Sequence, residues 1–255
     1  MQRIKLPATD STNAYLKRLL RERELPDGTL VSAGVQTRGR GQRGSGWKSE
    51  EGKNLTFSIL KRFSGFPARE HFRLNMAVSL AIVSVLDALE IPEISVKWPN
   101  DILSGPYKVC GILIENALQS GGITHSIVGI GLNVNQRAFP GLPAAASLAV
   151  RAGRNLDRDQ LLDRLQEALW KELSGLESQP SPEPPLRYGS LHDRYEARLF
   201  RKGAESKFST ADRGLFAGVI QGVDAEGRLL VATGERQVRA FGFKEIRLHY
   251  GPEAR

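Results

Sequence analysis

A loop rich in glycine and arginine is the first stretch of the chain that suggests chemistry. Residues 35–47 read VQTRGRGQRGSGW and hold four glycines and three arginines. So many glycines disfavour helix and strand, and they let the backbone approach a ligand and point its N–H groups at it. The arginines add fixed positive charge, so the loop suits an anion. Its spacing is neither the GxxxxGK[ST] of a phosphate loop nor a dinucleotide fingerprint that opens a helix.

A basic, glycine-rich loop can also be merely flexible or can contact nucleic acid non-specifically. Polar groups on neighbouring elements help to decide between these alternatives and an anion-binding loop. Ser11 and Thr12 precede an apolar helical repeat. Such hydroxyl groups usually only cap the helix, although a helix N-terminus also binds anions and carbonyl groups. A strand expected over 54–60 alternates apolar side chains with Thr56 and Ser58. One face of this strand should enter a core, and the other offers hydroxyl groups to whatever the loop covers.

Two later motifs bring an amide, a carboxylate and an ammonium group together. Pro99 forces a sharp exit from a strand and points Asn100 and Asp101 at one spot, although such a sequence is more often a plain turn. Lys108 opens the next apolar strand, where a solvated edge charge is the usual role. It is expected across a hairpin from Asn100 and Asp101, so a functional ammonium group near the glycine-rich loop is the alternative. Glycines within the strand at 129–133 mark close approach of a ligand or another backbone.

The composition bounds the class of protein. With 255 residues, 40% hydrophobic content and a mean hydropathy of -0.30, the chain fits an ordinary soluble protein with one large and one small domain. Its longest apolar stretch, Met76–Leu89, is interrupted by polar residues and predicts a buried helix rather than a membrane span. One cysteine allows no internal disulfide, in agreement with the cytoplasm, and four histidines without ligand spacing argue against structural zinc. The net charge of +8 favours an acidic partner or an anionic substrate.

The elements that must position these groups change character near residue 200. Upstream, an α+β domain is expected, with one helix over Arg69–Leu89 packed on a sheet and another opened by Asp157 and Gln160. A proline-rich loop at 178–185 follows. The strands of the sheet are expected to be antiparallel neighbours at Ile94–Trp98, Lys108–Glu115 and His125–Asn133. Downstream, a small antiparallel barrel is predicted from short strands at Gly214–Val223, Arg228–Ala232, Gln237–Phe241 and Glu245–Leu248.

Five motifs follow one another along the chain in a specific combination. They are Asp-Ser-Thr-Asn at 10–13, Gln-Thr-Arg-Gly-Arg-Gly-Gln-Arg-Gly at 36–44 with Trp47 after it, Lys-Trp-Pro-Asn-Asp at 97–101, Lys-Val-Cys-Gly-Ile-Leu-Ile-Glu at 108–115 and Gly-Ile-Gly-Leu-Asn at 129–133. Together they resemble biotin–protein ligases (biotin–[acetyl-CoA-carboxylase] ligases), and the likeness covers nearly the whole chain. It implies a catalytic domain of mixed sheet and helices over residues 1–200, akin to class II aminoacyl-tRNA synthetases. An SH3-like β-barrel over residues 201–255 would follow.

The resemblance also implies roles for single residues. Lys108 matches the family's essential lysine, Arg40 would act beside it in catalysis, and Asp101 would orient a Mg²⁺ ion or hold Lys108. Biotin contacts are implied for Ser11, Thr12, Asn13, Gln36, Arg40, Gly41, Gln42, Thr56, Ser58, Lys108 and Gly111. Nucleotide contacts are implied for Arg43, Trp47, Asn100 and Asn133. Many members carry arginine where this chain has Gln42, so either Gln42 or Arg43 would meet the phosphate of the intermediate.

The implied activity has two steps. ATP, with Mg²⁺, activates biotin to biotinyl-5′-AMP, and biotin then passes to a lysine of a biotin carboxyl carrier protein, an acyl-CoA carboxylase subunit. The resemblance implies a cytoplasmic enzyme without DNA or membrane partners, since only about ten residues precede Ser11, too few for the DNA-binding domain of some members. The family includes monomers and homodimers. The rivals are a lipoate or octanoyl ligase on the same fold and a nucleic-acid binding protein.

Overall fold

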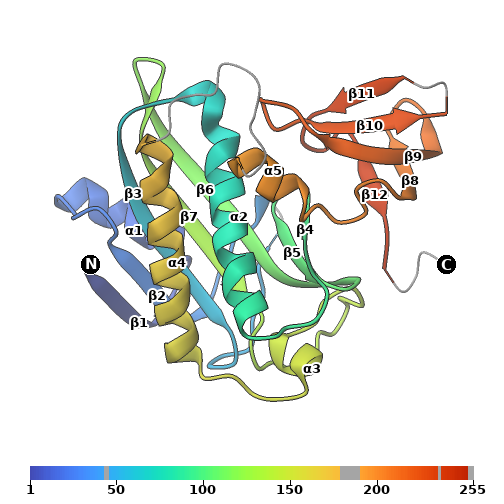
Figure 1. Ribbon diagram of the computed structural model, residues 1–255. Helices are drawn as coiled ribbons and strands as arrows, with labels where there is room; N and C mark the ends of the chain where they lie inside the picture. Colours follow the sequence, from blue (N-terminus) through green and yellow to red (C-terminus); the bar gives the residue numbers. More distant parts are fainter. Residues whose placement is uncertain (43–45, 179–189, 235–236, 252–255) are drawn as a thin grey trace.

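The computed structural model describes residues 1–42, 46–178, 190–234 and 237–251 (Figure 1). Its larger part is built on a seven-stranded sheet in the order β1-β2-β3-β7-β6-β5-β4. β1 runs parallel to β2, and the other neighbours are antiparallel. The strands are β1 (Arg3–Thr9), β2 (Leu30–Gln36), β3 (Leu55–Pro67), β4 (Ile94–Lys97), β5 (Asp101–Ser104), β6 (Tyr107–Gln119) and β7 (Gly122–Leu132). This mixed sheet and its helices form the expected α+β architecture.

Two long helices cover one face of the sheet. α2 (His71–Ala88) and α4 (Arg158–Ser178) lie side by side in front of it in Figure 1. They close the main apolar core, to which β3 contributes Phe57 and Ile59. The segment Ala68–Ala88 is long and apolar enough to cross a membrane, but 72% of its most apolar window is buried inside the protein. It is therefore the buried core helix that the sequence predicted.

A third helix packs on the opposite face. α1 (Thr12–Glu22) contacts β2, β3 and β7, and it completes a smaller apolar cluster of Leu16, Leu19, Leu25, Val31, Leu60 and Ile127. Successive side chains on a strand alternate between faces. Thr56 and Ser58 of β3 and Gly129 and Gly131 of β7 therefore point to the same face as Leu60 and α1. These small residues leave room beside the helix, and a cavity forms there.

The shorter helices and the start of α4 follow local signals. Asp157 Oδ1 accepts hydrogen bonds from the backbone N–H groups of Asp159 (2.9 Å) and Gln160 (3.0 Å), which is the capping predicted for α4. α3 spans Leu148–Ala152 and α5 spans Leu191–Glu196. The proline-rich loop predicted at 178–185 lies, after its first residue, outside the described residues.

Two strands of the large sheet were not expected. β5 lies between β4 and β6, so the segments around Ile94 and Lys108 are not direct neighbours as predicted. The strand escapes notice because it is only four residues long and begins directly after the Pro99 turn. β1 pairs in parallel with β2, and a parallel partner this far along the chain leaves no hairpin signal. The prediction that the segments at 108–115 and 125–133 are antiparallel neighbours is confirmed.

The C-terminal part is a five-stranded antiparallel sheet in the order β11-β10-β9-β8-β12. Its strands are β8 (Glu205–Thr210), β9 (Gly214–Val223), β10 (Leu229–Thr233), β11 (Val238–Phe241) and β12 (Arg247–His249), and β8 was not among those predicted. Within the described residues, β11 and β12 do not pair with each other, so this SH3-like domain is an open sheet rather than the closed barrel expected. β11 and β12 are the two edge strands of this sheet.

Contacts along β4 fasten the C-terminal sheet to the large one. The backbone N–H of Val96 donates to the carbonyl of Arg198 (2.7 Å), and that of Phe200 donates to Val96 (2.8 Å). Next to this bridge, the Trp98 ring stacks on Phe243 with centroids 5.4 Å apart, and its Nε1 donates to the Gly227 carbonyl (2.9 Å). The two sheets therefore share one apolar core. This docking brings β12 close to the turn that carries Asn100 and Asp101.

Candidate active site

The small residues beside α1 open into a cavity of about 210 Å³. Its wall is formed by the N-terminus of α1, the glycine-rich loop, the β5–β6 hairpin and β7. The predicted site residues that line it are Ser11, Thr12, Asn13, Gln36, Arg40, Gly41, Gln42, Trp47, Asn100, Asp101, Lys108 and Gly111. Five motifs that are far apart in the sequence therefore meet at one place.

Three other predicted site residues are not among those that line the cavity, and a fourth is not described. Thr56 and Ser58 are buried beneath the cavity, where Thr56 donates its hydroxyl hydrogen to a carbonyl of β2 (3.1 Å). Asn133 is buried as well, and its Nδ2 donates to the carbonyl of Ala146 (3.1 Å). Arg43 lies outside the described residues. Direct ligand contacts for these four residues stay predictions.

One end of the cavity is a network of hydroxyl and amide groups. The backbone N–H of Thr12 donates to Oε1 of Gln36 (2.8 Å), and Oγ1 of Thr12 lies 3.2 Å from the same oxygen. The buried Ser58 hydroxyl lies 2.7 Å from Oγ1 of Thr12 and 2.6 Å from Oδ1 of Asn13. Ser11 holds the predicted N-cap position of α1, but its side chain makes no capping hydrogen bond. Gln36 takes over the capping of this helix terminus.

Two charged residues that the sequence analysis did not single out hold Asn13 in place. Nδ2 of Asn13 donates to Oε2 of Glu115 (2.8 Å) and to the carbonyl of Leu113 (3.3 Å). The other Glu115 oxygen pairs with Nζ of Lys17 (2.6 Å). Their spacing in the sequence could have drawn attention to these two residues. Glu115 lies on the same face of β6 as Gly111 and Leu113, and Lys17 lies one helical turn after Asn13. The ion pair fixes the amide in one orientation.

The other end of the cavity carries an ammonium group. Nζ of Lys108 lies 2.5 Å from Oδ1 of Asp101, and Nζ of Lys97 lies 3.6 Å from Oδ2. The β5–β6 hairpin sets Asp101 opposite Gly111, so Lys108 reaches the carboxylate from across the hairpin, as expected. Nδ2 of Asn100 donates to a β6 carbonyl (2.7 Å), which anchors the same turn. One carboxylate thus aligns two lysines.

The glycine-rich loop folds over the cavity between these two ends. The backbone N–H of Trp47 donates to the Gly39 carbonyl (2.9 Å), and its indole ring lies against Gly131 of β7 and Gly111 of β6. A Cβ atom at Gly131 would overlap that ring, and one at Gly111 would lie 3.1 Å from it. Nζ of Lys108 lies 5.9 Å from the ring centroid. Close approach of the tryptophan is therefore why β7 carries glycine here.

Charge and polarity divide the cavity into two halves. Arg40 and Lys108 line it opposite one carboxylate, Asp101, among the described lining residues, so this half suits an anion. The amide and hydroxyl half suits a polar, uncharged group. In the described part of the chain, no group of three or more His, Cys, Asp or Glu residues is placed to hold a metal ion. Both Asp101 oxygens face lysines, which supports its role in holding Lys108, and its Mg²⁺ role stays a prediction.

Comparison with known proteins points to one family. The family model described as "Biotin/lipoate A/B protein ligase family" matches residues 6–133, which is half of the chain. The bifunctional ligase/repressor BirA of Bacillus subtilis is 30% identical over 214 residues, which are 82% of this chain but 63% of that protein. The biotin–[acetyl-CoA-carboxylase] ligase of Mycobacterium tuberculosis is 30% identical over 90% of this chain and 83% of its own. The chain thus spans less than two thirds of the Bacillus relative.

Solved structures agree with this result. The biotin protein ligase of Aquifex aeolicus in complex with biotin and ATP superposes with a TM-score of 0.75 at 29% identity, covering 98% of this chain and 99% of that one. The fold match therefore includes the C-terminal sheet as well as the large domain.

Proposed function

Because the chain belongs to the biotin/lipoate A/B protein ligase family, we propose that it is a biotin–protein ligase. In the first step, a biotin carboxylate oxygen bonds to the α-phosphorus of ATP, and the bond from that phosphorus to the oxygen bridging to the β-phosphate breaks. Biotinyl-AMP forms, and diphosphate leaves with the bonding electrons. In the second step, a lysine amine of a carrier protein attacks the biotinyl carbonyl carbon. AMP leaves, and the new amide nitrogen gives up its proton.

The two-ended cavity is the observation that carries this proposal. Its neutral end, made by Thr12, Asn13 and Gln36 over Ser58, offers amide and hydroxyl groups that pair with the N–H and C=O groups of a ureido ring. Lys108 lines its basic end and would neutralise the carboxylate and the α-phosphate as they meet. Positioning two anions and neutralising the developing charge is the main work of such a reaction.

The loop over the cavity suits an unstable intermediate. A mixed anhydride must be kept from water until the carrier lysine arrives. Trp47 lies over β7 and Lys108, where it would cover the adenylate. The family relatives named as biotin–protein ligases, including one solved with biotin and ATP, support ATP as the second substrate.

Mg²⁺ enters this proposal as part of the nucleotide substrate. Mg²⁺ in such sites is commonly bound by substrate phosphates and by only one or two protein carboxylates. The Asp101 carboxylate already forms ion pairs with Lys97 and Lys108. We further propose a biotin carboxyl carrier protein in the cytoplasm as acceptor, in keeping with the basic net charge of +8 and the single cysteine.

Lipoate is the rival substrate within the same family. Its alkyl chain and dithiolane ring would leave the amide and hydroxyl network unpaired, which costs strongly in a buried site. The protein, incubated with ATP, a carrier domain and either acid, should add a biotinyl group to one carrier lysine, as detected by intact mass. A carrier with that lysine replaced by arginine is the control. Transfer of lipoyl and not biotinyl groups would overturn the proposal.

Glu115 gives a prediction specific to this network. Glu115→Ala frees the Asn13 amide, and loss of a hydrogen bond to a charged group should raise KM for biotin about 10-fold or more, with KM for ATP nearly unchanged. Lys17→Ala is the matched control, because it removes only the half-exposed outer partner of Glu115 and should change KM for biotin less than about 2-fold. Equal effects of both variants on biotin and ATP would contradict this role.

A further inference from the structure

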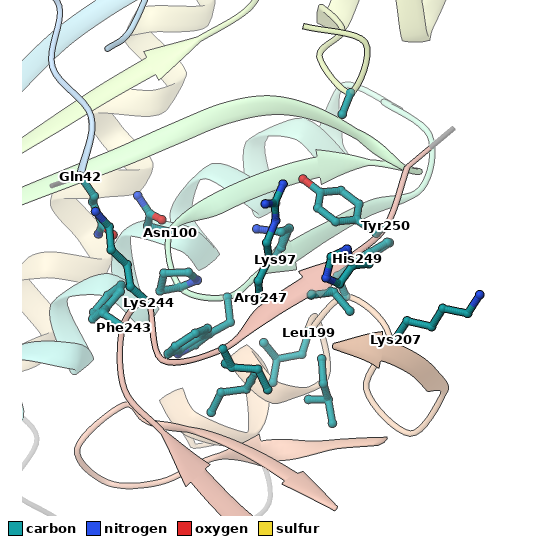
Figure 2. A pocket seen from close by; sticks show the side chains of 18 of the residues that line it. Gln42, Lys97, Asn100, Leu199, Lys207, Phe243, Lys244, Arg247, His249 and Tyr250 are labelled. Atoms are coloured by element: carbon teal, nitrogen blue, oxygen red, sulfur yellow. The ribbon is translucent and has the colours of Figure 1, made fainter. Parts of the chain in front are cut away.

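The basic end of the cavity borders a larger cleft between the two sheets. This cleft encloses about 920 Å³, and Gln42 and Asn100 line both spaces (Figure 2). Lys97 and Arg247 are among the other residues that line the cleft. A mixed anhydride in the cavity would therefore have a route to solvent on this side. Its retention depends on what covers it, and thus on how Trp47 is held in place.

Trp47 lies between two backbone anchors. Its own N–H donates to the Gly39 carbonyl, as described above. Three residues further along the chain, the backbone N–H of Glu50 donates to Oε1 of Gln136 (3.1 Å). Gln136 follows β7 and is 86 positions away from Glu50 in the sequence. The position of the tryptophan therefore depends on a side chain from a distant part of the chain.

The Gln136 amide is a firmly held acceptor. The residue is only 9% exposed, and its Oε1 also accepts a hydrogen bond from Nδ2 of Asn54 (2.6 Å). On the other side, Nε2 of Gln136 donates to the carbonyl of Ala138 (2.7 Å). Asn54 is fixed in turn, because its Oδ1 accepts from the backbone N–H of Val134 (2.9 Å). Each polar atom of the Gln136 amide thus has a partner, which sets the direction of the amide.

The same stretch of chain after β7 also holds Lys108. Nδ2 of Asn133 donates to the carbonyl of Ala146 (3.1 Å). The backbone N–H of Ala146 donates to the Lys108 carbonyl (3.1 Å), and the N–H of Lys108 donates to the Ala144 carbonyl (2.7 Å). Residues 133–136 therefore anchor both Lys108 and the segment that carries Trp47, which fixes the distance between these two groups.

Building on the proposed ligase function, we propose that Gln136 is a positioning residue for retention of the adenylate. It is not among the described residues that line the cavity, so it acts through the backbone of Glu50. It keeps Trp47 over biotinyl-AMP until the carrier lysine arrives. The neutral end of the cavity is held separately, by the contact of Asn13 with Glu115. Loss of the Gln136 amide should therefore affect retention of the adenylate and not binding of biotin.

The Gln136→Met variant tests this separation. Methionine keeps the length of the side chain but accepts neither hydrogen bond strongly, so the dissociation rate constant of biotinyl-AMP should rise about 10-fold. The Kd for biotin should stay within about 2-fold of the unmodified protein, because an interaction with the neutral end is not lost. A chase of labelled biotinyl-AMP with excess unlabelled compound measures the first quantity, and calorimetry measures the second. Gln136→Glu keeps both acceptor contacts and should recover part of the retention.

Asn135→Ala is the matched control. The Asn135 side chain also makes two hydrogen bonds, since Nδ2 donates to the Leu156 carbonyl (2.9 Å) and Oδ1 accepts from the Leu156 N–H (3.0 Å). These bonds hold the segment before α4 and not the segment around Trp47. Asn135→Ala should lower the melting temperature as Gln136→Met does, but it should change the dissociation rate constant of biotinyl-AMP less than about 2-fold.

A measurement on the unmodified protein tests the anchor without any variant. The side chain of Glu50 is exposed, but its backbone N–H is bonded to the buried Gln136 amide. In the complex with biotinyl-AMP, this N–H should exchange with deuterium about 10-fold or more slowly than an unpaired amide. If Gln136→Met does not fold, this exchange rate and the Gln136→Glu variant decide the question.

Three results would overturn the role of Gln136. They are unchanged retention of biotinyl-AMP by a folded Gln136→Met protein, equal losses of retention in Gln136→Met and Asn135→Ala, and rapid exchange of the Glu50 amide in the unmodified complex. Failure of the ligase function itself would look different, because the unmodified protein would then neither form nor bind biotinyl-AMP.

Discussion

Lys108→Ala is expected to slow biotinyl-AMP formation by about 10³-fold, the scale seen when one fixed donor to a developing charge is removed. The ammonium group is aligned by Asp101 at 2.5 Å and lies beneath the Trp47 ring. Without Lys108, Arg40 is the one lysine or arginine left among the described residues that line the smaller cavity. Single-turnover measurement of adenylate formation reads the effect without interference from the transfer step.

Two further measurements make this prediction specific. Lys108 is partly exposed, so its removal should shift the melting temperature little, and a folded but slow variant is the expected outcome. Asp101→Asn should give a smaller loss, because Lys108 would remain but lose its alignment. Near-normal turnover of a folded Lys108→Ala protein would remove this lysine from the mechanism.

Gly129→Val is expected to weaken biotin binding by about 100-fold or more. Any Cβ atom at this position would overlap the Asn13 side chain, which cannot withdraw because Ser58, Glu115 and the Leu113 carbonyl all hold it. The branched side chain would also project into the cavity that Gly129 lines. Overpacking typically costs about 1–3 kcal/mol, and a loss of about 2.7 kcal/mol in binding free energy is 100-fold in affinity.

Calorimetric titration with biotin measures this effect, with Gly129→Ala as a milder variant of the same kind. Gly175→Ala on α4 is the matched control, because a Cβ atom there meets nothing within 4 Å and alanine favours a helix. Wild-type affinity in a folded Gly129→Val protein would show that biotin does not bind against Asn13.

The sequence predicted the motifs of the site better than the contacts that support them. Residues such as Thr12, Trp47 and Lys108 stand in short patterns, and the resemblance named them directly. Glu115 and Lys17 could not be paired in advance, because they are 98 positions apart and meet only when α1 packs on the sheet. Their separate spacings on β6 and α1 were visible, but the contact between those elements was not.

The fold shows the same division. α2 and α4 followed from long apolar periodicity and capping residues, and most C-terminal strands followed from turns. β5 was missed because four residues after a proline carry too weak a signal. The closeness of Lys97 and Arg247 was beyond prediction, since it depends on the docking of the C-terminal sheet along β4 and on the stacking of Trp98 on Phe243.

The central claim is that the two-ended cavity joins biotin to AMP, and ATP–diphosphate exchange tests it most directly. Labelled diphosphate should enter ATP only when biotin is present, and lipoate should not replace biotin. The Lys108→Ala protein should lose this exchange by about 10³-fold while remaining folded. Exchange that is independent of biotin, or no exchange at all from the intact protein, would contradict the claim.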